Sequence, residues 1–261
     1  MAVTTAITLR DVSLSLGGER ILDGANLALP VGATGVVMGE TGCGKSSLLR
    51  LLLGLPGYQR EDRAEIGGIV EVRGASIFDL GPGDLQAMRR SMGLIKGTGG
   101  LIENMDIRRN IGLALAYGTS GLRVDQVAAR CQAVLEDLGI EHLAQPGLRP
   151  IALNLEEHFY AELARTRVAE VDILLADDPT IGLGVGASQR VVDRLCEGAA
   201  QTRLIATTWL QPYLERADAF YLLADGRIRL LGDADSLAAC DHPWVRAELA
   251  GGRRVQRYSG R

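Results

Sequence analysis

The segment GETGCGKSS, at positions 39–47, constrains this chain more than any other part of its sequence. It lies between the apolar run GVVM, which is typical of a strand buried on both faces, and the apolar stretch SSLLRLLLGL (46–55), which favours a helix. A G-x-x-x-x-G-K-S turn in this position lets backbone N–H groups converge on phosphate oxygens, and the helix dipole strengthens their attraction. The segment therefore predicts a phosphate-binding loop on an α/β fold.

The side chains of this loop suit a nucleotide that carries a metal ion. Lys45 is placed to reach the β- and γ-phosphates, and Ser46 is placed to ligate Mg²⁺. In DILLADDPT (172–180) an apolar strand ends in two acids, of which Asp177 is predicted to orient Mg²⁺ and Asp178 to polarise an attacking water. The predicted cofactor-binding residues are Gly39, Glu40, Thr41, Gly42, Cys43, Gly44, Lys45, Ser46 and Ser47.

Strand and helix patterns alternate along most of the chain, which indicates a parallel sheet covered by helices. Alternating apolar residues predict strands at 6–16 and 68–77, the second of them in a separate sheet, and helical patterns dominate from about 85 to 148. One of those helices, VDQVAARCQAVLEDL, is expected to end at Gly139. A hairpin is expected around Asp225-Gly226.

Charge and cysteine content exclude several classes of protein. The net charge of −4 gives no bulk attraction to nucleic acid, so no nucleic-acid partner is expected. The four cysteines form no CxxC pair, which favours reduced thiols over a zinc site or a disulfide framework. No stretch approaches 18 consecutive apolar residues, so the chain is not expected to span a membrane by itself. Residues 251–261, GGRRVQRYSGR, are predicted to be a flexible basic tail.

With these motifs the chain resembles the ATP-binding subunits of ABC transporters over about residues 6–250. The resemblance implies an α/β P-loop NTPase fold with a RecA-like parallel-sheet core, an antiparallel β-subdomain and a helical subdomain. It places the ATP-binding domain at 1–250 and the helical subdomain at about 85–165. It also implies ATP and Mg²⁺ as cofactors, a transmembrane permease as partner, and a second ABC ATPase, identical or different, paired head to tail with this chain.

The segment LNLEEHFYAELAR (153–165) ends like the signature helix of that family, and its AR aligns LNLEE with the family's LSGGQ. In this register Asn154 replaces the serine, while Leu155 and Glu156 replace the two glycines that allow approach to the γ-phosphate of the partner's ATP. Placing a carboxylate against a polyanion at a partly buried site costs on the order of several kcal/mol of Coulomb repulsion. Glu156 and Glu157 are therefore expected to reject the opposite ATP unless they point away.

Five further positions depart from the family pattern. Gly97 stands where a glutamine follows a strand, Asp178 replaces the catalytic glutamate, and Gly184 replaces an aspartate in the loop after it. Thr208 replaces the switch histidine, and Leu16 stands where an aromatic residue stacks on adenine. Misplacing a catalytic group by about 1 Å can cost on the order of 10²-fold in rate. The resemblance thus implies a degenerate ATPase with weak or absent hydrolysis at its own composite site.

Three segments resemble the Mla/MCE-type lipid-transport ATPases in particular: SMGLIKGTGGLIENMDIRRNIGLAL (91–115), PTIGLGVGAS (179–188) and DHPWVRAEL (241–249). This resemblance implies phospholipid transport, a peripheral position on the cytoplasmic face of the inner membrane, and an MCE-type lipid-binding protein as a further partner. Ile102, Met105 and Ile107 are candidates either for contact with a permease or for the core.

Two other functions remain open from the sequence. The chain could be a structural or regulatory protein that uses the ABC fold for interactions outside transport. It could also be a divergent but active ATPase in which Asp178 is the catalytic base and another residue replaces the switch histidine. ATP turnover by the isolated protein would distinguish a divergent ATPase from a degenerate subunit. The proteins that co-purify with the chain would distinguish a structural or regulatory protein from a transporter subunit.

Overall fold

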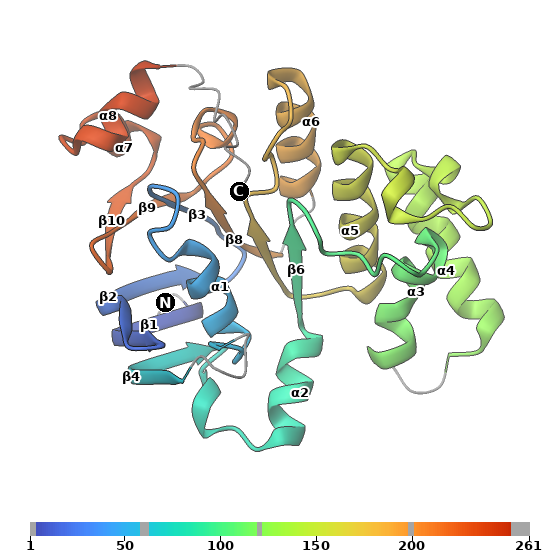
Figure 1. Ribbon diagram of the computed structural model, residues 1–261, viewed down its shortest axis with the longest axis horizontal. Helices are drawn as coiled ribbons and strands as arrows, with labels where there is room; N and C mark the ends of the chain where they lie inside the picture. The colour runs from blue at the N-terminus through green and yellow to red at the C-terminus, as the bar shows by residue number, and fades with distance from the viewer. Residues whose placement is uncertain (1–3, 58–62, 119–121, 198–200, 252–261) are drawn as a thin grey trace.

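Two β-sheets form the centre of the computed structural model, which describes residues 4–57, 63–118, 122–197 and 201–251, without the side chains of 116–118 (Figure 1). The larger sheet has the order β10-β9-β3-β8-β7-β6, and all its neighbouring strands pair in parallel except the β9–β10 hairpin. Its strands are β3 (Thr34–Met38), β6 (Met92–Lys96), β7 (Ile173–Asp177), β8 (Thr202–Thr207), β9 (Ala219–Ala224) and β10 (Arg227–Gly232).

The smaller sheet is antiparallel and has the order β2-β1-β4-β5. Its strands are β1 (Thr5–Leu16), β2 (Glu19–Pro30), β4 (Ala64–Val72) and β5 (Ala75–Ser76). This arrangement confirms the predicted fold class, an α/β P-loop fold with a parallel core sheet and a separate antiparallel sheet. The limits of a helical subdomain remain a prediction.

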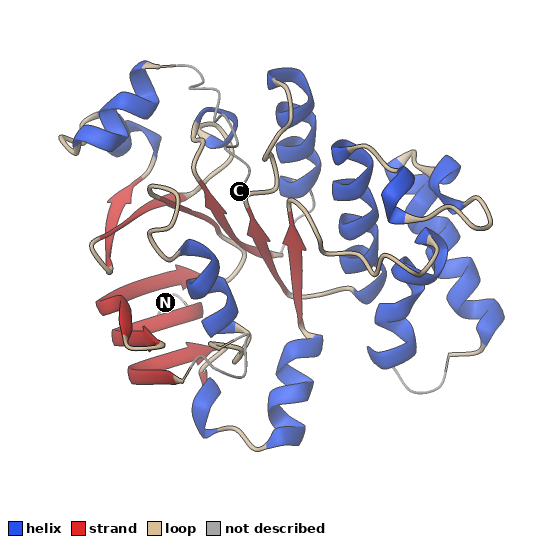
Figure 2. Cartoon of the chain, viewed as in Figure 1, coloured by secondary structure: helices blue, strands red, loops and turns tan. Residues whose placement is uncertain are grey.

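Helices connect the parallel strands and cover the larger sheet (Figure 2). They are α1 (Lys45–Leu52), α2 (Pro82–Arg90), α3 (Ile107–Gly118), α4 (Val124–Leu138), α5 (Leu155–Ala169), α6 (Val185–Cys196), α7 (Ala234–Ala238) and α8 (Pro243–Ala250). Four 3-10 turns lie at η1 (Ile77–Asp79), η2 (Glu141–Ala144), η3 (Pro150–Ala152) and η4 (Gln211–Tyr213). Helices α3 and α4 pack on the far side of α5 from the larger sheet, at the right of Figure 1.

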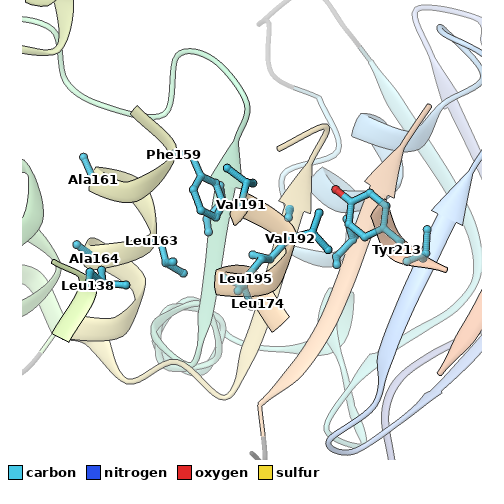
Figure 3. Close-up of a cluster of buried hydrophobic side chains, with 14 of the residues drawn as sticks. Leu138, Phe159, Ala161, Leu163, Ala164, Leu174, Val191, Val192, Leu195 and Tyr213 are labelled. Atoms are coloured by element: carbon cyan, nitrogen blue, oxygen red, sulfur yellow. The ribbon is translucent and has the colours of Figure 1, made fainter. Parts of the chain in front are cut away.

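The apolar core is divided between the two faces of the larger sheet because successive side chains of a strand point in opposite directions. Val36 and Met38 of β3 belong to a cluster with α5 and α6, whereas Val37 belongs to a cluster with α1 and the smaller sheet. Figure 3 shows Phe159 of α5 and Val191 of α6 within the first cluster. Burial on both faces explains the apolar run GVVM that makes up β3 after Thr34.

Most predicted elements are confirmed, with one correction. Gly139 ends α4 in a left-handed conformation (φ 68°), and the β9–β10 hairpin turns at Asp225-Gly226. The predicted strand at 68–77 is wrong in its extent, because the chain turns at Arg73-Gly74, where both residues have positive φ. The predicted basic tail lies outside the described residues, apart from Gly251.

Candidate nucleotide-binding site

The phosphate loop joins β3 to α1 and is packed tightly against β9. A Cβ added to Gly39 would lie 2.4 Å from the carbonyl oxygen of Leu223, so only glycine allows this approach. Gly44 begins α1 in a left-handed conformation (φ 108°), which a residue with a side chain rarely adopts. The first N–H groups of a helix have no partner within it, and the positive end of the helix dipole lies at this end of α1.

Lys45 and Ser46 face the ends of the neighbouring strands. The Lys45 ammonium donates to the carbonyl oxygens of Gly39 (2.9 Å) and Glu40 (2.8 Å), and the residue is only 5% exposed. The Ser46 hydroxyl donates to Oδ1 of Asp177 at the end of β7, at 3.0 Å. A buried ammonium beside a helix N-terminus fits a polyphosphate, and adjacent hydroxyl and carboxylate oxygens fit Mg²⁺.

Asp178 is held by the residue that follows β8. The Thr208 backbone N–H donates to Oδ1 of Asp178 at 2.9 Å, and the Thr208 hydroxyl lies 3.5 Å from the same oxygen. Burial raises the pKa of the Asp178 carboxyl, although hydrogen bonding from Thr208 and the charge of Lys45 lower it in part. Asp178 also has a positive φ of 44°, a strained value for a residue with a side chain. Asp178 and Thr208, two of the positions that depart from the family pattern, are thus hydrogen-bonded to each other.

Gly97, a third such position, packs directly against Asp178. The Gly97 N–H donates to the Asp177 carbonyl at 3.0 Å, which extends the β6–β7 pairing by one bond. A Cβ on Gly97 would lie 2.3 Å from the carbonyl oxygen of Asp178. A glutamine at this position would therefore require the backbone of one of the two segments to move.

The tip of α5 is a well-formed helix start. Oδ1 of Asn154 accepts from the Glu157 N–H, and Oε2 of Glu157 accepts from the Asn154 N–H, both at 2.9 Å. Such a reciprocal capping box satisfies two backbone donors that the helix leaves unpaired, and losing the capping side chain costs about 1 kcal/mol. The Glu157 carboxylate is therefore turned back onto its own helix.

Glu156 also faces its own chain. Its two carboxylate oxygens accept from Nε and Nη2 of Arg190 on α6, at 2.8 and 2.7 Å. This bidentate pair neutralises the charge that the sequence placed against the partner's ATP. Both glutamates are thus engaged by groups of their own chain, and their orientation toward a partner's ATP remains a prediction. No sequence pattern pointed to Arg190, which lies 34 residues later.

The three remaining predicted positions are spread around the loop. Leu155 is 39% exposed, and its Cδ1 would lie 2.7 Å from a Cβ added to Gly182. Gly184 is the first residue before α6, and a Cβ there would meet no atom within 4 Å. Leu16 ends β1 half-buried, where it packs on the core cluster shared with α1.

Glu162 of α5 is an important residue that sequence reasoning missed. It is fully buried, and its Oε2 accepts from the Lys96 N–H at 2.7 Å, at the start of the loop after β6. Arg165, one turn further along α5, donates to the Gly100 carbonyl of the same loop at 2.7 Å. A Cβ on Gly100 would lie 2.2 Å from Oε2 of Glu162. A charged residue at a buried helix position was the signal that could have identified this clamp.

Two hollows adjoin these elements. One, of about 430 Å³, lies between the phosphate loop, β2, the β9–β10 hairpin and α8. The other, of about 590 Å³, lies between α3, α4 and the loop near Pro146, and Met105 lines it. From the sequence, Ile102 and Ile107 are candidates either for contact with a permease or for the core. Ile107 is fully buried in the core, whereas Ile102 is 40% exposed.

A glycine-rich loop between β3 and α1, with an acid at the end of a nearby parallel strand, defines a P-loop nucleotide-binding protein. The model of the family described as ABC transporter matches residues 22–181, well over half of the chain. The chain therefore belongs to the ABC transporter family and contains its ATP-binding domain. Domains of this kind bind ATP, dimerise and work with transmembrane permease subunits.

Similar proteins include "Intermembrane phospholipid transport system ATP-binding protein MlaF" of Escherichia coli (strain K12), 28% identical over 96% of this chain and 90% of that protein. "Fe(3+) ions import ATP-binding protein FbpC 2" of Rhodococcus jostii (strain RHA1) is 28% identical over 88% of this chain and 63% of that protein. A solved dimeric ATP-binding cassette in a post-hydrolysis state, bound to ADP and Pi, has a TM-score of 0.73 at 22% identity, covering 87% of this chain and 98% of that one. In the part of this chain that the structure describes, no helix is long and apolar enough to cross a membrane.

Proposed function

We propose that this chain binds Mg²⁺-ATP at the phosphate loop and serves as a slow or static ATP-binding subunit of a phospholipid transporter. The observation that carries the proposal is that Lys45, Ser46 and Asp177 lie together at one loop. The Ser46 hydroxyl oxygen is 3.0 Å from Oδ1 of Asp177. Lys45 would exchange its carbonyl partners for phosphate oxygens. Ser46 and Asp177 would hold Mg²⁺, which supplies charge neutralisation at the phosphates when it is bound.

Slow hydrolysis is supported by the way the Asp178 carboxylate is held. A general base must reach the attacking water, and it needs a free oxygen in the right place. Oδ1 of Asp178 already accepts from the Thr208 N–H, and Asp178 is a shorter side chain than glutamate. The phosphate-binding half of the site is thus retained, while the groups that would activate water are restrained.

Phospholipid as the cargo is supported by likeness to MlaF, which extends over 96% of this chain. Relatives with similar identity are named for iron import and macrolide export, so the cargo is a proposal and not a family property. A transporter of this kind would comprise a permease, a second ABC ATPase that supplies an intact LSGGQ segment, and an MCE-type lipid-binding protein. The chain would then lie peripherally on the cytoplasmic face of the inner membrane.

Nucleotide binding and turnover by the purified chain test the first part of the proposal. We expect ATP to bind with Mg²⁺ by calorimetry, Lys45→Ala to abolish that binding, and phosphate release to stay near background. Arg50→Ala, which removes a basic side chain from the last turn of α1 outside the loop, is the matched control for effects on folding. Normal turnover that is lost with Lys45→Ala would instead identify a divergent but active ATPase.

Affinity purification of the chain from detergent-solubilised membranes of its native host tests the second part. We expect a polytopic membrane protein, another ABC ATPase and a lipid-binding protein to co-purify, with phospholipid in the extract. Recovery of the chain with only soluble partners would contradict the transport assignment and favour a regulatory use of the fold.

A further inference from the structure

The hollow of about 430 Å³ beside the phosphate loop is lined by one large aromatic side chain, that of Trp244. Gly39, Glu40, Gly42 and Cys43 of the loop line it together with Trp244 of α8. Helix α8 lies at the upper left of Figure 1. The volume of the hollow lies within the range of roughly 300–1,000 Å³ that is typical of small-molecule sites. A ligand whose phosphates occupied the loop would therefore have room to extend its other end toward α8.

The lining of the hollow divides into a polar part and an apolar part. Ile21 of β2 and Leu223 of β9 provide aliphatic surface, and Trp244 provides a flat face. A nucleobase is a flat aromatic group that gains most from stacking on such a face, and it does so with any of the large aromatic side chains. Leu16, which the sequence placed at a base-stacking position, is not among the residues that line this hollow.

A polar group lies next to Trp244. His242, the residue before α8, lines the same hollow, and its Nδ1 is buried without a hydrogen-bond partner among the described residues. A buried polar atom without a partner costs about 1–3 kcal/mol, so a ligand that hydrogen-bonds to it would gain by satisfying it. The edge of a purine carries amine and ring nitrogens that can do so.

Helix α8 is fixed well enough to present this ring. Val245 is fully buried and Trp244 itself packs against the core cluster that includes β9 and α6. Arg246 donates to the Cys240 carbonyl, and the Gln211 side chain donates to the carbonyl of Leu249 at 3.4 Å. An aromatic side chain anchored on one side keeps its other side available for stacking.

We propose that Trp244 is the base-stacking residue of the nucleotide site and that His242 contacts the edge of the base. The inference rests on the proposed function, since it places the base of a nucleotide whose phosphates occupy the loop of the same chain. It assigns the C-terminal helix, rather than the end of β1, to recognition of the nucleoside.

Comparison of ATP with inorganic tripolyphosphate tests this inference, because only ATP has a base. We expect Trp244→Ala to weaken ATP binding about 10-fold by calorimetry, which corresponds to about 1.4 kcal/mol. Tripolyphosphate affinity should not change, and Trp244→Phe should bind ATP nearly as well as the wild type. Leu249→Ala, a partly buried position on the same helix outside the hollow, is the matched control and should leave both affinities unchanged.

Intrinsic fluorescence keeps the test independent of the alanine variant's folding. ATP, but not tripolyphosphate, should quench the wild-type emission, and Trp244→Phe should lose that quenching although Trp209 remains. The inference is overturned if Trp244→Ala binds ATP like the wild type, or if it loses ATP and tripolyphosphate equally while remaining folded. Wild-type protein that binds neither compound would overturn the proposed function itself, whereas binding of tripolyphosphate but not ATP would overturn only this assignment.

Discussion

The buried carboxylate of Glu162 should make the stability of this protein depend on pH in a direction that a single substitution can reveal. Burial raises the pKa of Glu162 from 4.5 to about 7, although the Lys96 N–H and the charge of Arg165 oppose the shift. Glu162→Gln keeps the shape of the side chain and removes the titration. Its carbonyl can accept from the Lys96 N–H, and its amide replaces Oε1, which has no hydrogen-bond partner among the described residues.

The sign and size of the effect follow from the raised pKa. A carboxyl that binds its proton more tightly in the folded protein stabilises it fully below the unfolded pKa, and this contribution is lost as the pH rises through the folded pKa. A rise of the pKa from 4.5 to about 7 corresponds to about 3 kcal/mol, because a tenfold change in proton affinity is worth about 1.4 kcal/mol. Relative to Glu162→Gln, the wild type should therefore lose about 3 kcal/mol of unfolding free energy between pH 4.5 and pH 7.5.

Urea unfolding of both proteins at half-unit steps of pH provides the measurement. Because other titrating groups are common to both proteins, they cancel in the difference between the two unfolding free energies. Glu141→Gln, a change at an exposed glutamate, controls for the removal of one carboxylate. A wild-type minus Glu162→Gln difference that stays constant over this range would refute the assignment of a raised pKa to Glu162.

Three other substitutions test the packing around the site. Gly100→Ala should cost about 1–3 kcal/mol by overpacking against Glu162, and the same change in a Glu162→Ala background should cost less than about 0.5 kcal/mol, as measured by a double-mutant cycle in urea. Gly97→Ala should also destabilise the protein by about 1–3 kcal/mol, because its Cβ would meet the Asp178 carbonyl. Thermal unfolding measures this change, and an unaltered melting temperature would contradict the close packing of Gly97 against Asp178. Asn154→Ala should cost about 1 kcal/mol through loss of the α5 cap, whereas Asn154→Ser should cost a few tenths, and equal stability of the two variants would contradict the capping role.

The phosphate loop and the acids after β7 could be located from the sequence because each depends on a local pattern. The loop needs glycines at fixed spacing between a strand and a helix, and Asp177 needs only the end of an apolar strand. The α/β class followed similarly from the alternation of apolar periods. These features are determined by residues that are close together in the chain.

The pairs that define the electrostatics of the site could not be inferred in this way. The charge of Glu156 is neutralised by Arg190, 34 residues later. The backbone N–H of Lys96 donates to the carboxylate of Glu162, 66 residues later. No sequence period connects such partners, because they are brought together by the packing of α5 against α6 and β6. An alignment of the α5 tip shows which residues replace the glycines, but not where their carboxylates point.

The position of β3 at the middle of its sheet has a consequence for synthesis of the chain. Its two neighbours, β8 and β9, end at residues 207 and 224, whereas β3 itself ends at residue 38. At about 5–20 residues per second, a ribosome needs roughly 10–40 s to deliver both partners after β3 has been made. Both edges of the apolar β3 segment therefore lack their partner strands throughout this interval, and unpaired strand edges of this kind favour aggregation during synthesis.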